Sequence, residues 1–521
     1  MFEVKQFYSV RTGRIFAGLT AWMIVLTVTQ AVYAIPVFSR KYRTSCITCH
    51  SGFPKLNSTG EAFRRNGYQF PRDDDILVKD EPIPLGNDRY KDMWPNSLWP
   101  NDIPNLPPIA MRARMGFNQY LGQRAASEQS TDFQYPNDVS LLSGGTLGKD
   151  ISWYGSIVLA GAGSHGAGGG HGGGEEERSL APDLERFFVQ FSNLFAWSDE
   201  EDENGMRTGN RWLTLPRHAM NLRVGQFEPQ VIAPWRSIHR QIGTTPYLVN
   251  VATMGGNGFM FEPAQRGIEI NGIIRQNNSY VIGLVNGNGA ESAWDNNSQK
   301  DFYFRVARKW WGFPMDGVIG QAEQVNPDTG GDDPPGEDEM APMGLDFWRE
   351  IQFETGVFGY LGRNQSSVTV EDNVDLLRSD GVTTYTLLGT RDVIRPDRFE
   401  RLGFDARMQY QDFDLFGAWT YGWNKDPISD EDPDTIAPDE MSTWFVEADY
   451  YFKPWLIGYS RYEELNFQND ERQAEAGVKR AVVGASAYIR TNVRLVSEFV
   501  IDAQGNNTTG DTVNFLLDFA Y

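Results

Sequence analysis

Apolar and polar residues alternate at every second position through most of this chain. From Ala110 onward the alternation recurs in segments of about ten residues, which are separated by stretches rich in Gly, Asn, Asp and Pro. A period of two is typical of β-strands that have one apolar face. We expect strands at 111–117, 151–159, 187–195, 222–227, 268–274, 280–285, 302–306, 351–360, 385–388, 402–410, 413–421, 443–451, 455–462, 482–489, 493–500 and 513–521, and a weaker one near Val318.

The spacing and the end of this strand series predict a transmembrane barrel. Short gaps such as Gln411-Asp412 and Thr491-Asn492 alternate with long polar loops, as in bacterial barrels with short periplasmic turns and long outer loops. The last strand carries apolar residues at alternate positions and ends on the aromatic Tyr521. We therefore predict an all-β fold, an antiparallel barrel of about 16 strands over 109–521, with roughly 14 or 18 as the alternatives. The outer face of such a barrel would contact outer-membrane lipid. The competing interpretation of the last segment is an ordinary half-buried terminal strand.

The N-terminal sequence predicts where the protein is located, and the net charge bears on which partners it can bind. Residues 1–34 read as a signal peptide, with basic residues first, an apolar stretch over 15–28 and small residues before a cleavage site after Ala34. A retained membrane anchor is the alternative. No later apolar run is long enough for a transmembrane helix. The chain has 69 acidic and 47 basic residues, a net charge of −22, which argues against a nucleic-acid partner.

One short motif carries redox chemistry. Both cysteines of the chain lie in Cys46-Ile-Thr-Cys49-His50, the C-x-x-C-H pattern of covalent haem attachment. The two thiols of such a motif form thioethers with the haem vinyl groups, and the histidine ligates the iron. A zinc site would need two further Cys or His ligands, and none lies between Ser51 and Ser164. We predict one haem c, with a redox dithiol and a plain disulfide as the alternatives.

The segment from 35 to 108 is expected to form a small monohaem domain. It contains one clear helix pattern from Ser58 to Asn66, with Asn57 or Ser58 as the N-cap and Gly67 as the stop signal. Phe63 is placed to pack on the haem. Arg64 and Arg65 either pair with the haem propionates or form a solvated basic face, which is the favoured interpretation. A segment this small needs a wall from the rest of the chain to bury haem.

The second axial ligand of the iron stays open at the sequence level. Met93 is the candidate distal ligand, because a methionine is a natural partner to histidine. A five-coordinate iron or a more distant ligand is the alternative, and His239 in the strand-free stretch from 230 to 266 is one such residue. That stretch is also expected to fold inward as a constriction loop. His165 and His171 lie in a glycine-rich loop that binds metal weakly or is disordered.

The residues from Cys46 to Tyr68, which include Phe53-Pro54, Leu56-Asn57 and Gly60, resemble the fused monohaem cytochrome–porins of the bacterial outer membrane. The resemblance covers about residues 37–71, and the remainder agrees only in its strand pattern. It implies a haem plug within the barrel or on its periplasmic side, with Cys46, Cys49 and His50 as the haem residues. It also implies electron transfer across the outer membrane and, for its best-known members, Fe(II) oxidation. No catalytic residue is assigned here.

A wide lumen filled by the N-terminal segment favours the same function on physical grounds. We expect an electron conduit between an extracellular donor such as Fe²⁺ and a periplasmic electron-carrier cytochrome. Acidic loops at 326–339 and 425–440 would attract cations or simply be solvated. The alternatives are a cation or solute porin with a structural or sensory haem plug, and a periplasmic haem-containing binding protein.

Overall fold

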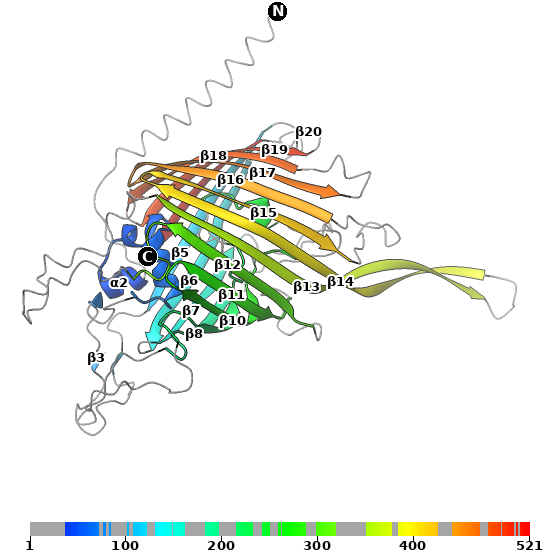
Figure 1. The fold of residues 1–521 in the computed structure, drawn as a ribbon. Coiled ribbons are helices and arrows are strands. Elements are labelled where there is room, and N and C mark those ends of the chain that lie inside the picture. Colours follow the sequence, from blue (N-terminus) through cyan, green and yellow to red (C-terminus); the bar gives the residue numbers. More distant parts are fainter. Residues whose placement is uncertain are drawn as a thin grey trace, which may run out of the picture.

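The computed structural model shows a closed β-barrel with a small N-terminal segment at one end (Figure 1). It describes residues 37–71, 77–79, 83–84, 102–103, 108–121, 131–147, 150–161, 183–196, 215–232, 242–250, 259–261, 263–287, 299–318, 351–377, 384–425, 440–468, 478–490, 492–504, 507–508 and 511–520. No helix in these ranges is long and apolar enough to cross a membrane. The expected signal peptide lies outside the described residues.

The barrel wall contains sixteen crossing strands, the number expected from the sequence. They are β5 (Ile109–Tyr120), β6 (Thr131–Leu147), β7 (Ile151–Gly161), β8 (Asp183–Phe191), β9 (Asn221–Phe227), β10 (Gln265–Ile274), β11 (Asn278–Val285), β12 (Asp301–Trp311), β13 (Gln352–Leu377), β14 (Thr384–Tyr410), β15 (Phe413–Asn424), β16 (Glu440–Lys453), β17 (Leu456–Gln468), β18 (Val478–Arg490), β19 (Val493–Gln504) and β21 (Thr512–Ala520).

Each crossing strand pairs antiparallel with its neighbours, and β21 closes the ring by pairing with both β19 and β5. The short β20 (Asn507–Thr508) pairs only with the end of β19. Because the number of crossings is even, β5 begins and β21 ends at the same rim. The tight turn at Gln411-Asp412 joins β14 to β15 at that rim, so it is the end with short turns, the periplasmic end of such barrels.

The main differences between the expected and observed strands concern β6, β14 and the segment near Val318. β6 was missed, because Pro136, Gly144 and Gly145 weaken its strand pattern. The segments 385–388 and 402–410 belong to one strand, β14, which with β13 extends beyond the other strands as a two-stranded ribbon (Figure 1). The weak strand near Val318 is wrong: Met315 and Asp316 form a turn after β12, and Val318 lies in no strand.

The side chains of the wall have the polarity of a transmembrane barrel. Along β12, Asp301, Tyr303 and Arg305 are buried in the lumen, whereas Val306 and Trp310 are about half exposed. Large apolar side chains also face outward on other strands: Ile268, Ile282, Leu284, Val357, Phe404, Val446 and Val483. An apolar exterior around a charged lumen is the reverse of a soluble barrel and suits a lipid surround. The chain is therefore a β-barrel of the bacterial outer membrane.

Two segments occupy the lumen. The N-terminal segment comprises α2 (Val37–Tyr42), η1 (Cys46–Thr48), the hairpin β1 (His50–Gly52) and β2 (Lys55–Leu56), and α3 (Ser58–Arg65). It lies at the rim where β5 begins (Figure 1). The connection between β9 and β10 folds inward, as expected, and its helix α6 (Tyr247–Asn250) contacts β15, β16 and β17. Two small strands, β3 (Ile83–Pro84) and β4 (Asp102–Ile103), pair outside the barrel sheet.

Candidate functional site

The C-x-x-C-H motif forms a compact unit because Asn57 ties it to helix α3. The Asn57 side chain caps the helix by accepting a hydrogen bond from Gly60 N at 2.9 Å. Its amide Nδ2 donates to the carbonyl oxygens of Ile47 and Thr48, and its backbone N–H donates to Cys49 O at 3.0 Å. A Cβ at Gly60 would overlap the Cys49 carbonyl group. The helix therefore packs directly on the motif, and only glycine permits this close approach.

Helix α3 ends just before Gly67, the stop signal predicted from the sequence. Gly67 has a φ of +71° and its N–H donates to Arg64 O, while Tyr68 N donates to Phe63 O at 2.9 Å. This is the Schellman pattern, in which glycine takes the left-handed conformation after the helix. The reversal brings Tyr68 back beside Phe63, with 6.3 Å between their ring centroids. Both rings line the cavity next to the motif.

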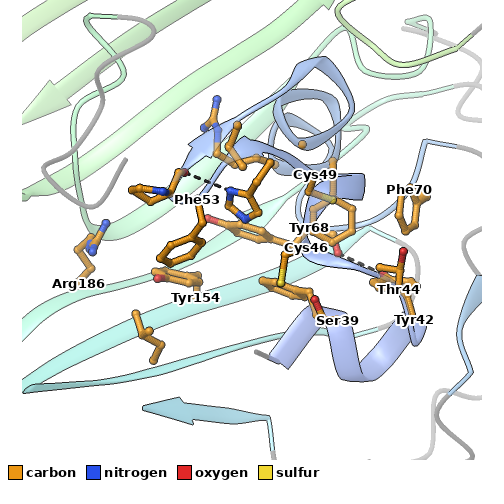
Figure 2. Close-up of a pocket in the computed structure, with 18 of the residues that line it drawn as sticks. Ser39, Tyr42, Thr44, Cys46, Cys49, Phe53, Tyr68, Phe70, Tyr154 and Arg186 are labelled. Atoms are coloured by element: carbon orange, nitrogen blue, oxygen red, sulfur yellow. Dashed lines mark hydrogen bonds between the residues drawn. The ribbon is translucent and has the colours of Figure 1, made fainter. Parts of the chain in front are cut away.

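A cavity of about 250 Å³ lies between the N-terminal segment and the barrel wall (Figure 2). Cys46, Cys49 and His50 line it from the N-terminal segment, and both thiols are free. Burial raises the pKa of the Cys46 thiol and raises the pKa of the Cys49 thiol to about 12. Nine aromatic side chains contribute to the remaining wall: Phe38, Tyr42, Phe53, Phe63, Tyr68, Phe70, Tyr154, Phe188 and Phe227.

The residues around the cavity fit a covalent haem. His50 Nδ1 lies 3.2 Å from the carbonyl oxygen of Pro54. A ring nitrogen that donates to a carbonyl fixes the tautomer, so Nε2 is left with its lone pair for a metal. The aromatic wall matches a flat apolar ring, and four arginines that line the cavity, Arg64, Arg112, Arg186 and Arg223, place positive charge beside it, as the carboxylates of haem require. The described residues contain no cluster of three or more His, Cys, Asp or Glu side chains suited to another metal ion.

Charged contacts fix the N-terminal segment to the wall. Lys55 Nζ lies 2.8 Å from Asp414 and 2.5 Å from Asp449, and all three side chains are buried. Arg494 Nη1 donates to Phe53 O at 2.8 Å, and Tyr488 OH donates to the same oxygen at 3.1 Å. The lumen wall therefore holds the hairpin that follows the motif, which keeps His50 and the thiols against the cavity.

The arginines of α3 are paired rather than solvated. Arg64 is buried and its Nη2 lies 3.0 Å from Glu61. The side chain of Arg65 is 11% exposed and lies 3.4 Å from Glu354 on β13. The favoured sequence interpretation, a solvated basic face, is therefore wrong, because the barrel wall covers the helix. Arg112 and Arg114 point into the lumen and pair with Asp518 and Asp138.

Several candidate residues lie outside the described residues: Met93, His165, His171, His239 and the acidic loops 326–339 and 426–439. The structure adds four wall residues that sequence reasoning missed, namely Tyr154 on β7, Arg186 and Phe188 on β8 and Arg223 on β9. They are inward positions of ordinary alternating strands. Only the closure of the barrel brings them beside a motif more than a hundred residues earlier, so no local pattern identifies them.

Comparisons with known proteins give likenesses of structure only. No protein-family model and no curated protein sequence matches the chain. Among solved structures, OmpF of Salmonella typhi in complex with daunomycin aligns with 10% identity and a TM-score of 0.44, over 79% of this chain and 97% of that chain. OmpT of Vibrio cholerae has 7% identity and a TM-score of 0.44 over the same shares.

The outer-membrane channel DcaP of Acinetobacter baumannii has 9% identity and a TM-score of 0.42, over 79% of this chain and 96% of that chain. The assignment of this chain rests on its own closed ring of sixteen strands and on the polarity of its two faces. These features define a porin-like barrel of the bacterial outer membrane.

Proposed function

We propose that this chain is an outer-membrane electron conduit. One covalent haem c, attached at Cys46 and Cys49 and ligated by His50, would carry electrons between an extracellular donor and a periplasmic carrier cytochrome. The observation that carries the proposal is the position of the motif: all three residues line one cavity inside the barrel, at the rim with the short turns. A haem there is within reach of a periplasmic protein and is shielded from lipid by the wall.

The residues of the chain have separate roles in this proposal. The two thiols anchor the ring, and His50 Nε2 is the proximal ligand, oriented by the Pro54 carbonyl. The aromatic wall excludes water and lowers the local dielectric, which is one of the ways in which a protein sets a haem potential. When bound, the haem supplies a one-electron carrier. The identity of the distal ligand, with Met93 as its candidate, belongs to the same proposal.

Packed aromatic rings support an electron path toward the outer rim. Tyr68 stacks on Tyr154 at 5.5 Å, and Tyr154 lies 6.0 Å from Phe188. Farther along, Arg223 lies over Phe188 and pairs with Glu269 at 3.2 Å.

The path continues on β12 to β14. Glu269 accepts a hydrogen bond from Tyr303 OH at 2.7 Å, and Tyr303, Tyr360 and Phe399 stack in sequence at 6.1 and 5.8 Å. Phe399 pairs with Asn424, the last residue of β15, so this series of contacts ends at the rim opposite the cavity. A donor outside the cell would thus be joined to the cavity by a series of ring contacts, one ion pair and one hydrogen bond.

We propose Fe²⁺ as the donor, in keeping with the acidic composition of the chain. In the test, purified outer membranes are titrated anaerobically with Fe²⁺ while the haem absorbance is followed. We expect reduction of the haem, and loss of that response in His50→Ala but not in His218→Ala, a histidine in the turn between β8 and β9. A haem that stays oxidised with Fe²⁺ but is reduced by dithionite would remove iron as the donor.

The second candidate function is a cation or solute channel with a structural or sensory haem plug. The charged lumen favours it, since Arg305, Arg401, Arg461, Glu447 and Glu463 are all buried on the inner face of the wall. Conductance in planar bilayers separates the two functions. A plugged conduit passes little ion current, whereas a channel conducts steadily with the plug in place. An open conductance in the haem-loaded protein would favour the channel.

A further inference from the structure

We infer that Arg64 and Arg223 form a carboxylate clamp that binds the two propionates of the haem, with one arginine from the plug and one from the barrel wall. The inference rests on the proposed function, because it assigns residues to the proposed haem. The clamp would fix the orientation of the ring in the cavity and would make β9 part of the cofactor site.

Each of the two arginines presents a buried hydrogen-bond donor with no acceptor. Arg64 is 5% exposed, its Nη1 donates to Gln230 and its Nη2 donates to Glu61, but its Nε has no acceptor among the described residues. Arg223 is 4% exposed, its Nη2 donates to Gln190 at 2.8 Å, and its Nε likewise lacks an acceptor there.

An unsatisfied buried donor costs about 1–3 kcal/mol, and more when the group is charged. Both side chains line the cavity of the C-x-x-C-H motif. A bound group that brings carboxylates into this cavity would offer both arginines a charged acceptor. Arginine also prefers carboxylates, because its planar N–H groups match their geometry.

Arg186 provides a comparison within the same cavity. It lines the same cavity and is equally buried, but all three of its nitrogens have acceptors. Its Nε donates to Ser156, its Nη1 donates to Glu228 at 2.7 Å and its Nη2 donates to Glu185 at 3.2 Å. Arg186 therefore belongs to the wall itself, whereas Arg64 and Arg223 combine a place in the cavity lining with an unsatisfied Nε.

The positions of the two groups suit the chemistry of haem. The vinyl groups that bind the thiols and the two propionates occupy different edges of the ring. With Cys46 and Cys49 fixing one edge, a clamp made by Arg64 on α3 and Arg223 on β9 would hold the other. The ring would then bridge the plug and the wall, which explains how a segment too small to bury haem alone can do so here.

The test uses the purified full-length protein carrying its haem, and the readout is the midpoint potential measured by spectroelectrochemistry from pH 5 to pH 8. Arg64→Gln and Arg223→Gln each remove a positive charge beside a propionate, so the ferric form gains stability and the potential falls. A propionate without its donors in a buried site also binds protons more readily, so the potential becomes dependent on pH in this range. Arg186→Gln is the matched control: it removes a positive charge beside the same cavity but no donor to a propionate, so its potential should stay independent of pH in this range.

Arg223→Gln leaves the buried Glu269 without one of its partners. The double variant Arg223→Gln/Glu269→Gln removes both charges of that pair and is measured alongside, so the clamp is still tested if the single variant fails to fold. A lower, pH-dependent potential in the Arg64 and Arg223 variants, with no pH dependence in Arg186→Gln, supports the clamp. Potentials that stay independent of pH, or the same pH dependence in all three arginine variants, overturn it while the haem proposal stands. A folded wild-type protein without haem overturns both.

Discussion

Replacement of Lys55 by methionine should loosen the plug without unfolding the barrel. Lys55 reaches from the β1–β2 hairpin to two carboxylates, Asp414 and Asp449, whose side chains are 1% and 0% exposed. Methionine keeps the length and the apolar stem but removes the ammonium group. Asp414 still has Arg407 at 2.7 Å, whereas Asp449 loses the one cation that lies within ion-pair distance of it among the described residues.

The magnitude follows from the burial of this pair. Removal of one partner from a buried ion pair costs about 3–5 kcal/mol, because an uncompensated charge remains. Since Arg407 still compensates one carboxylate, we expect the lower end, about 3 kcal/mol. Each 1.36 kcal/mol is a factor of ten in an equilibrium constant, so opening of the plug should become about 150-fold more frequent.

Hydrogen exchange of the backbone amides in α3 measures this opening, since exchange tracks local unfolding. The control is Lys479→Met: this lysine is 57% exposed, lies 3.7 Å from Glu464 and should change exchange by less than about fivefold. The double variant Lys55→Met/Asp449→Asn should recover much of the protection. Exchange in α3 that rises no more in Lys55→Met than in Lys479→Met would refute the reasoning.

Three further perturbations test other parts of the structure. Burial and the neighbouring Arg217 lower the pKa of His218 to about 4, so the unfolded state binds one more proton than the folded state between about pH 6.5 and pH 4. Relative to His218→Gln, the wild type should lose about 3 kcal/mol of stability as the pH falls through this window. Equal changes of stability with pH in the two proteins would contradict this. Gly60→Ala introduces a Cβ that overlaps the Cys49 carbonyl group, so the yield of haem-loaded protein should fall severalfold, as measured by the ratio of haem to protein absorbance, whereas Gly458→Ala, on β17, should not change it. Glu498→Ala removes the acceptor for the backbone N–H and hydroxyl of Thr244, so the inward loop should loosen at this contact and bilayer conductance should rise. An unchanged conductance would show that this contact does not hold a constriction closed.

Strand number was predictable because lipid and lumen impose opposite polarities on alternate residues. The agreement at sixteen strands nevertheless conceals compensating errors. β6 was missed because its proline and paired glycines weaken its local strand pattern. β14, which includes the ribbon, was expected as two separate strands. Pairing with β5 and β7 stabilises β6 in spite of its sequence, and such tertiary support is invisible in a local pattern.

Of the residues around the cavity, only those of the C-x-x-C-H motif and its helix could be singled out from the sequence. Cys46, Cys49 and His50 stand together in the sequence with the C-x-x-C-H spacing that covalent haem attachment requires. Arg223 lies on the seven-residue strand β9 and has the sequence context of any inward-facing residue. Only the closure of the barrel places it beside the cavity. The pairing of Arg65 was misjudged for the same reason, because its partner Glu354 lies on β13, far along the chain.

The presence of covalent haem in the native protein is the most direct test of this account. The protein is isolated from outer membranes, denatured, extracted with acidified acetone and then examined by its haem absorbance. We predict one haem per chain that survives extraction, and its loss in Cys46→Ala and Cys49→Ala variants whose barrels still fold. A folded wild-type barrel that carries no haem, purified from cells able to attach haem c to other proteins, would contradict the account and leave a channel in its place.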